Sequence, residues 1–270
     1  MKSNPSQPIG LFDSGVGGLT VAHAIKSLLP GERLVYFGDT FHLPYGDKSN
    51  ESVKYYSERI TDFLLQYNCK VILIACNTAS AIALQEVKKK AGKSALVLNV
   101  IDPVVDFVNS HFTAGKIGVI GTKGTINSGT YKKKINEKNS QLEITSVPTP
   151  LLVPMIEEGF IYDDISNAII RAYLSDVRLE DISGLILGCT HYPIIKRQIE
   201  KFFNFNVRII DSAVIMAERL KQLLEQKYLL NTHAKRDDRF YVSDYTDNFA
   251  RIAKLFFEEE IKLEKVDIWT

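Results

Sequence analysis

The sequence has almost no net charge. Among its 270 residues, 33 lysines and arginines stand against 32 aspartates and glutamates, which gives a formal net charge of +1. A chain without a strong positive field does not hold a polyanion by charge alone. We therefore expect no nucleic-acid partner, and a small molecule is the more natural ligand.

Cysteine is also scarce. The chain has three cysteines, Cys69, Cys76 and Cys189, which are widely spaced and form neither a C-x-x-C pair nor a Cys/His pattern. An odd, dispersed set of this kind argues against a disulfide framework and against a structural zinc site. We predict reduced thiols, no metal site and a cytoplasmic location.

Long hydrophobic runs are missing as well. Apolar stretches such as residues 71–76 are far too short to span a bilayer, and the opening "MKSNPSQP" lacks the apolar core of a signal peptide. We therefore expect a soluble protein with no membrane partner.

What the sequence does contain is a regular alternation of short β-branched runs and amphipathic segments. The stretch 50–67 places apolar side chains three and four residues apart, with Ser49 or Asn50 as its N-cap, and is predicted to be a helix. A terminal stretch, 239–257, reads as a strand, a Thr or Asp cap and a helix that packs on the first half of the chain. Predicted buried strands are 8–12, 34–37, 71–75, 96–100, 117–120, 185–187 and 207–210. The alternation predicts an α/β fold with mainly parallel sheets.

A weak internal similarity indicates that the chain has two related halves. "IGLFDSGVGGLT" (9–20) can be aligned with "IGVIGTKGTINS" (117–128), and each is followed at a similar distance by a strand that ends in cysteine. We predict two pseudo-symmetric α/β lobes, each with a mainly parallel sheet flanked by helices, and an active site between them. The first lobe would comprise residues 1–100 and 211–270, and the second residues 101–210.

Polar residues that directly follow predicted strands are the candidates for function, because ligands of open α/β sheets bind at the carboxyl ends of the strands. We expect a helix to begin right after Cys76 and after Cys189, so that its free N–H groups stabilise a thiolate and a substrate carboxylate. The candidates are Asp13, Ser14, Cys76, Asn77, Thr78, Cys189, Thr190 and His191.

A free cysteine is more often a buried packing residue than a reactive one. We interpret Cys69, which precedes its strand, in that way. Two cysteines at matching strand ends of matching lobes indicate a function instead. Inversion of a stereocentre needs a base on one face of the carbon and an acid on the other, so the pair predicts a racemase, with Asp13 and His191 steering the protons.

Two further segments fit a pocket for an amino acid. "FGDTFHLPYG" (37–46) ends in a turn that would offer the phenol of Tyr45 and the backbone amide of Gly46. Glu157 stands near the end of a predicted helix, where a carboxylate is unfavourable to the helix dipole, and this raises the chance of a role in the site. The glycine-rich loops match neither a dinucleotide-binding pattern nor a Walker pattern.

At these residues the chain resembles the glutamate racemases, cofactor-independent enzymes that supply D-glutamate for bacterial peptidoglycan. The resemblance covers essentially the whole length, through "GLFDSGVGGLTV", "VYFGDTFHLPYG", "ACNTASA", "IGVIGTKGTI", "VPMIEEG" and "LGCTHYP". It implies two lobes that face each other across a buried site, no cofactor, glutamate as the substrate and a homodimer. By resemblance, Cys76 and Cys189 are the acid/base thiols, and Asp13, Glu157 and His191 assist them. The implied substrate contacts are Asp13, Ser14, Tyr45, Gly46, Asn77, Thr78, Thr190 and His191.

Two alternatives remain open at the level of sequence. Spacing does not distinguish a glutamate racemase from an aspartate or hydantoin racemase of the same superfamily. A non-catalytic amino-acid-binding module would also have two lobes and carboxylate-binding loops, although it gives no reason for a pair of cysteines.

Overall fold

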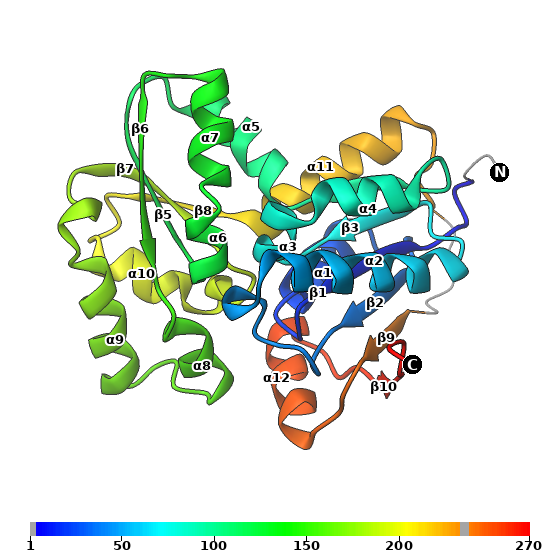
Figure 1. The fold of residues 1–270 in the computed structure, drawn as a ribbon. Coiled ribbons are helices and arrows are strands. Elements are labelled where there is room, and N and C mark those ends of the chain that lie inside the picture. The colour runs from blue at the N-terminus through cyan, green and yellow to red at the C-terminus, as the bar shows by residue number, and fades with distance from the viewer. Residues whose placement is uncertain (1–3, 233–237) are drawn as a thin grey trace. The chain divides into compact units, whose positions relative to one another are not determined.

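A computed structural model describes residues 4–232 and 238–270. The chain forms two compact units, each with its own parallel sheet (Figure 1). The first unit consists of the residues up to Val100 together with Ala213–Thr270, and the second unit is Ile101–Ser212. The predicted α/β class with mainly parallel sheets is confirmed.

The sheet of the first unit has six strands in the order β10-β9-β2-β1-β3-β4, all parallel. The strands β1, β2 and β3 are fully buried, as expected for a parallel sheet covered on both faces. The strands are β1 (Ile9–Asp13), β2 (Leu34–Gly38), β3 (Val71–Ile74), β4 (Leu96–Asn99), β9 (Arg239–Val242) and β10 (Leu263–Lys265).

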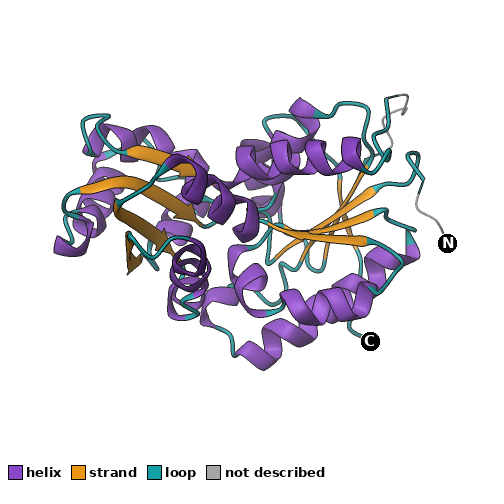
Figure 2. Ribbon diagram, turned by 90° about the horizontal axis from the view of Figure 1, so that it is seen from above, coloured by secondary structure: helices purple, strands orange, loops and turns teal. Residues whose placement is uncertain are grey.

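Helices lie on both faces of this sheet (Figure 2). The elements are α1 (Leu19–Leu28), η1 (Tyr45–Asp47), α2 (Asn50–Gln66), α3 (Asn77–Ile82), α4 (Leu84–Ala91), α11 (Ser212–Gln226) and α12 (Asp247–Phe257). The predicted helix is α2, and Ser49 is its N-cap, with a hydroxyl that accepts from the backbone N–H of Ser52. The predicted strand, Thr cap and helix near the C-terminus are β9, Thr246 and α12, and β9 pairs with β2 of the first unit. Across the described ranges, no helix combines the length and the apolar character needed to cross a membrane.

The second unit contains a four-stranded parallel sheet in the order β6-β5-β7-β8. Its strands are β5 (Gly115–Gly121), β6 (Leu142–Pro148), β7 (Ile182–Gly188) and β8 (Arg208–Asp211). Its helices are α5 (Ile101–His111), α6 (Lys123–Asn127), α7 (Thr130–Lys138), α8 (Leu152–Glu157), α9 (Asp164–Leu174), η2 (Val177–Leu179), η3 (Tyr192–Ile195) and α10 (Lys196–Phe202).

The two sheets repeat one topology. If the strands of each unit are counted from its own first strand, β2-β1-β3-β4 and β6-β5-β7-β8 follow the same order. The registers also agree, because Phe12 pairs with Ile74 in one sheet and Ile120 pairs with Leu187 in the other. In both cases a cysteine follows two residues beyond the paired residue of the third strand. The predicted pseudo-symmetry is therefore present in strand order and register.

Two strands, β6 and β10, were not among those predicted from sequence. The strand β6 lies at the edge of its sheet, and its side chains are partly exposed along its length. The segment therefore reads "LEITSVP", a mixture of polar and apolar residues, instead of the continuous apolar run that marks a buried strand.

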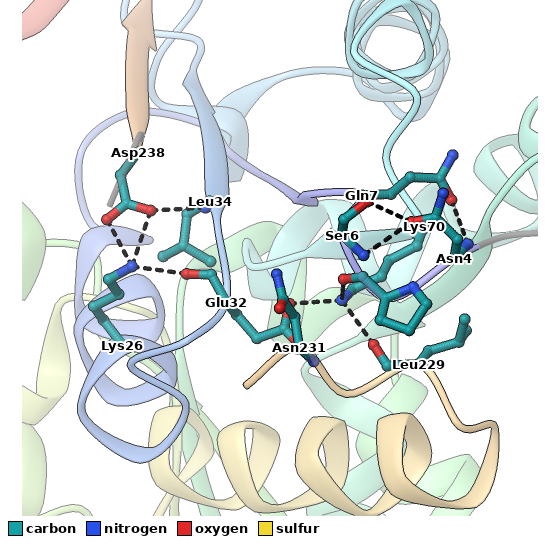
Figure 3. A network of polar contacts seen from close by, with 11 residues as sticks. Asn4, Ser6, Gln7, Lys26, Glu32, Leu34, Lys70, Leu229, Asn231 and Asp238 are labelled. Carbon is teal, nitrogen blue, oxygen red and sulfur yellow. Dashed lines mark hydrogen bonds and ion pairs between the residues drawn. The ribbon is translucent and has the colours of Figure 1, made fainter. Parts of the chain in front are cut away.

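A buried polar network lies at the amino edge of the six-stranded sheet (Figure 3). Lys70 Nζ lies 2.6 Å from Glu32 Oε2, and both side chains are fully buried. The ammonium also donates to the carbonyls of Pro5 and Leu229, while Asn231 donates its backbone N–H to Glu32. Burial raises the pKa of Glu32 and lowers that of Lys70, and the contact between the two groups opposes both shifts. The network therefore connects segments that are distant in sequence by charge-assisted hydrogen bonds.

Candidate active site

Cys76 lies at the carboxyl edge of the first sheet, where β3 ends and α3 begins. Its thiol is the N-cap of α3, since the sulfur accepts the backbone N–H of Ala79 at 3.4 Å. The hydroxyl of Ser14 lies 3.7 Å from the same sulfur. The residue is 5% exposed. The expectation of a helix directly after this cysteine is confirmed, and one helix N–H and one hydroxyl lie beside the thiol.

Asp13 ends β1 at the same edge and is fully buried. Its Oδ2 accepts the backbone N–H of Gly15 at 3.1 Å, and Tyr36 donates its hydroxyl to the carbonyl of Gly15 at 2.8 Å. Burial and the neighbouring charges of Asp13 and Cys76 raise the pKa of Tyr36, so this phenol stays a neutral donor. Gly18 leaves room for the carboxylate, because a Cβ there would lie 2.6 Å from Cβ of Asp13.

Asn77 and Thr78 form the first turn of α3 and are both buried. Gly46 lies in η1, next to Tyr45. The sequence candidates Asp13, Ser14, Cys76, Asn77 and Thr78 are thus assembled along two adjacent strand ends, β1 and β3.

The phenol of Tyr45 is fixed by a carboxylate that the sequence analysis did not include among the site residues. The Tyr45 hydroxyl donates to Oδ2 of Asp39 at 2.7 Å, and the Ser243 hydroxyl donates to Oδ1 at 2.8 Å. His42 Nδ1 lies 3.0 Å from both oxygens. Burial raises the pKa of Asp39, and these hydrogen bonds oppose the rise. The available signal was the position of Asp39 directly after β2, the same criterion that selected Asp13.

Cys189 directly follows β7 in the second unit and is 6% exposed. Its Sγ lies 3.8 Å from Nδ1 of His191, and the Thr190 hydroxyl lies 3.5 Å from the same nitrogen. The other ring nitrogen of His191, Nε2, lies 2.8 Å from Oε1 of Glu157 at the end of α8. The structure therefore brings Cys189, Thr190, His191 and Glu157 together in one polar cluster.

His191 is poised to carry a positive charge in this cluster. Burial alone would lower its pKa, but hydrogen bonds and charge interactions with Cys189 and Glu157 outweigh burial and raise the pKa to about 10. As an imidazolium, the ring can donate through both nitrogens, toward the sulfur and toward the carboxylate. A proton is thus held within hydrogen-bonding reach of the thiol.

The expectation of a helix directly after Cys189 is wrong. The chain forms the short 3-10 helix η3 from Tyr192, and the α-helix α10 starts only at Lys196. Pro193 explains the difference, because it has no N–H to donate to the carbonyl of Cys189, the first hydrogen bond of an α-helix that began there. His191, instead of helix N–H groups, is the main polar neighbour of this thiol.

Further aromatic residues around Cys189 were missed by the sequence analysis. The Tyr192 hydroxyl lies 2.6 Å from Oγ1 of Thr149, and burial together with the charge of Cys189 raises the pKa of Tyr192. Burial, Asp102 and Cys189 likewise raise the pKa of Tyr131. Tyr192 stood next to His191 in the sequence, but Tyr131 and Thr149 come from other elements and carry no local signal.

The third cysteine has a different environment. Cys69 is buried just before β3, and burial raises its pKa to about 12. A Cβ on Gly10 would lie 2.9 Å from its sulfur, so the thiol is packed tightly against β1. These features fit the packing role expected from the sequence.

Comparison with known proteins identifies the class. The family model for Asp/Glu/Hydantoin racemase matches residues 19–220. The match covers most of the chain and includes both Cys76 and Cys189. The chain belongs to the Asp/Glu/Hydantoin racemase family.

Relatives that match over nearly the full length are glutamate racemases. The chain is 42% identical over 261 residues to the glutamate racemase of Chlorobaculum parvum, with 96% of each chain covered. It is 40% identical over 251 residues to that of Neisseria meningitidis, covering 93% of this chain and 92% of the relative. The crystal structure of the glutamate racemase of Francisella tularensis in complex with D-glutamate matches with a TM-score of 0.92 and 40% identity, covering 98% of this chain and 99% of that one.

Proposed function

We propose that this chain is an enzyme that interconverts L-glutamate and D-glutamate by acid/base chemistry at two thiols. One observation carries the proposal. Cysteines follow the third strand of two sheets with the same strand order, in a chain that matches named glutamate racemases over nearly its whole length. Neither cysteine alone would indicate racemisation, but the pair supplies the base and the acid that inversion requires.

In the proposed mechanism, a thiolate removes the Cα proton of glutamate and the opposite thiol delivers a proton to the other face of the carbon. Cys76 acts as the base on D-glutamate and Cys189 as the base on L-glutamate, an assignment carried over from the family resemblance. Each turnover leaves one sulfur protonated and the other ionised, which is the starting state for the reverse direction. The proton count therefore balances without another reactant.

Negative charge that develops on Cα must be delocalised into the α-carboxylate, which needs dense hydrogen bonding. Ser14, Asn77, Thr78 and Thr190 are the proposed donors. The first three surround Cys76, and the Ser14 hydroxyl is already 3.7 Å from its sulfur. The same groups would therefore bind the substrate and stabilise its carbanion.

His191 and Asp13 are proposed to manage the protons of the two thiols. His191 is hydrogen-bonded to Glu157, and its Nδ1 lies 3.8 Å from Cys189 Sγ. The ring can therefore return a proton to that sulfur or take one from it. Asp13 is the corresponding carboxylate on the Cys76 side, fixed at the end of β1 by Gly15. Tyr45 and Gly46 are proposed to contact the substrate from the loop after β2.

Glutamate is proposed as the substrate in preference to aspartate, because the relatives that match at about 40% identity are named for glutamate. A supply of D-glutamate for peptidoglycan, a cytoplasmic location and a homodimer complete the proposal by family resemblance. Comparison of turnover on L-glutamate and on L-aspartate tests the substrate directly, and a preference for aspartate would contradict this assignment.

The decisive experiment follows both racemisation and Cα–H exchange in heavy water, with each enantiomer separately. Removal of either thiol should lower racemisation by at least about 10²–10⁴-fold, the usual contribution of a general acid or base. Cys189→Ala should still exchange the Cα hydrogen of D-glutamate, and Cys76→Ala that of L-glutamate. Cys69→Ala is the matched control and should keep near-normal turnover. Near-normal racemisation by Cys76→Ala would refute the mechanism.

The binding-module alternative makes a different prediction in the same experiment. A protein that only binds glutamate would never introduce deuterium at Cα, whichever enantiomer is supplied. Because the two enantiomers have equal free energies, kcat/KM must also be equal in the two directions for any active variant. An apparent inequality would indicate a contaminating activity.

A further inference from the structure

The C-terminal segment packs against the loop that carries Tyr45. The strand β10 pairs with β9, and Val266 continues the pairing by donating its N–H to the carbonyl of Val242 at 2.9 Å. Arg59 of α2 holds the segment further along by donating to the carbonyl of Ile268. Val266, Ile268 and Trp269 pack on the hydrophobic cluster that includes Tyr45 and Cys76. The C-terminal segment is therefore anchored on the cluster to which Tyr45 and Cys76 belong.

Trp269, the single tryptophan of the chain, meets two aromatic rings there. Its ring centroid lies 4.5 Å from that of His42 in an edge-on arrangement and 5.5 Å from that of Tyr56. His42 in turn stacks on Tyr56 with centroids 4.0 Å apart and an interplanar angle of 15°. The imidazole is thus held by stacking on Tyr56 and by perpendicular contacts with Trp269 and with Phe41, whose ring centroid lies 4.9 Å away, and these contacts limit its rotational freedom.

Two series of contacts connect these rings to Tyr45. In the first, His42 Nδ1 lies 3.0 Å from the Asp39 oxygens, and Asp39 Oδ2 accepts the Tyr45 hydroxyl at 2.7 Å. In the second, Tyr56 contacts Tyr45 directly, with ring centroids 5.7 Å apart. Loss of the indole would remove one ring contact from His42 and one from Tyr56, and so loosen Asp39 and Tyr45.

We propose that Trp269 is a positioning residue for the loop that carries Tyr45 and Gly46. It acts on this loop through His42 and Asp39. The inference rests on the proposed function, in which Tyr45 and Gly46 contact glutamate. It adds a residue from the far end of the chain to the determinants of substrate binding. Trp269 itself touches His42 and Tyr56 and carries no chemistry.

The site of the substitution favours a local effect over collapse of the fold. Trp269 is only partly buried, and a cavity of about 300 Å³ already lies between α2 and the C-terminal segment, lined by Arg59, Phe63, Val266 and Ile268 among others. The strand pairing of β10 and the bond from Arg59 remain.

The test compares Trp269→Ala with Trp269→Phe in the full-length enzyme. Trp269→Ala should raise KM for glutamate about fivefold, equivalent to about 1 kcal/mol of binding, while kcat stays within about twofold because neither thiol moves. Trp269→Phe keeps an aromatic edge against His42 and should restore most of the affinity. Removal of Thr270 alone shortens the same segment without losing the ring, and it should behave like wild type.

A double-mutant cycle with His42→Ala distinguishes positioning from general destabilisation. If Trp269 acts through His42, the second substitution should add little to the KM of the first. Additive effects, an unchanged KM in Trp269→Ala, or a fall in kcat alone would each overturn the proposal. If wild type fails to racemise glutamate, the proposed function fails instead, and that outcome is seen before any variant is made.

Discussion

His191 connects Glu157 to Cys189. One ring nitrogen lies 2.8 Å from the carboxylate and the other lies 3.8 Å from the sulfur. The imidazole therefore has an anionic partner on one side and a potentially anionic partner on the other. Both stabilise the protonated ring, and this explains why its pKa is raised to about 10 despite burial.

Substitution of Glu157 should shift the pH dependence of racemisation. Glu157→Gln removes one of the two groups that raise the pKa of His191, so the imidazolium should be lost at lower pH. We expect the alkaline limb of kcat/KM to move down by about one unit or more, the size of shift that one neighbouring charge causes. Profiles from pH 6 to 10.5 measure this. Glu158→Gln changes the adjacent, exposed carboxylate and should leave the profile where it is; an equal shift in both variants would contradict the assignment.

The same raised pKa predicts a pH-dependent contribution to stability. A group whose pKa is higher in the folded state stabilises that state fully below its unfolded value of 6.5, and the contribution is lost as the pH rises through about 10. The gap in free energy of unfolding between wild type and His191→Asn should therefore narrow from pH 6 to pH 10. Urea titrations at several pH values measure the gap. His111→Asn, at the exposed end of α5, is the control, and a gap that widens with pH would contradict the prediction.

Gly18 should tolerate no side chain. A methyl group there would lie 2.6 Å from Cβ of Asp13 and 3.0 Å from the Tyr36 hydroxyl, so Asp13 must shift. Gly18→Ala should cost about 1–3 kcal/mol of stability, the usual penalty of overpacking, and should also lower racemisation. Gly15→Ala is the matched control in the same loop, because its nearest neighbour, Leu43, would be 3.4 Å away. Thermal unfolding and racemisation rates of both variants test this prediction. Equal losses of stability and activity in the two variants would show that steric conflict with Asp13 is not the cause.

Removal of one charge of the Lys70–Glu32 pair should lower the free energy of unfolding far more than removal of both charges. Lys70→Met leaves a fully buried carboxylate without its ammonium, which should cost about 3–5 kcal/mol. The double variant Lys70→Met/Glu32→Gln removes both charges and should recover much of that loss. Denaturant titration of Lys70→Met, Glu32→Gln and the double variant tests this. A double variant with the summed loss of the single variants would show that the charges do not interact.

The sequence was sufficient for the fold class because buried parallel strands leave a strong signal. Runs such as "VILI" before Cys76 are apolar on both faces and are bounded by helical patterns, and the predicted strands match the observed ones to within a few residues. The edge strand β6 gave no such signal because part of its surface is exposed. Pro193 was visible in the sequence, and it was the residue that should have excluded a helix directly after Cys189.

The candidate site was accessible from sequence mainly where its residues follow strands. Asp13, Cys76 and Cys189 met that criterion, whereas Tyr45 was selected by its turn and Glu157 by its place near a helix end, and the family resemblance supplied their roles. The contacts that orient them are formed by residues far apart in the chain. Ser243 reaches Asp39 across 204 positions, and no local pattern of residues encodes such a meeting.

The single indole at position 269 makes the first unit optically distinct from the second. Fluorescence excited selectively at the indole reports only the melting of the unit that holds Trp269, whereas far-ultraviolet circular dichroism records both sheets at once. Two coincident denaturation curves would mean that both units unfold as one cooperative body, and separated curves would give the stability of each from one sample.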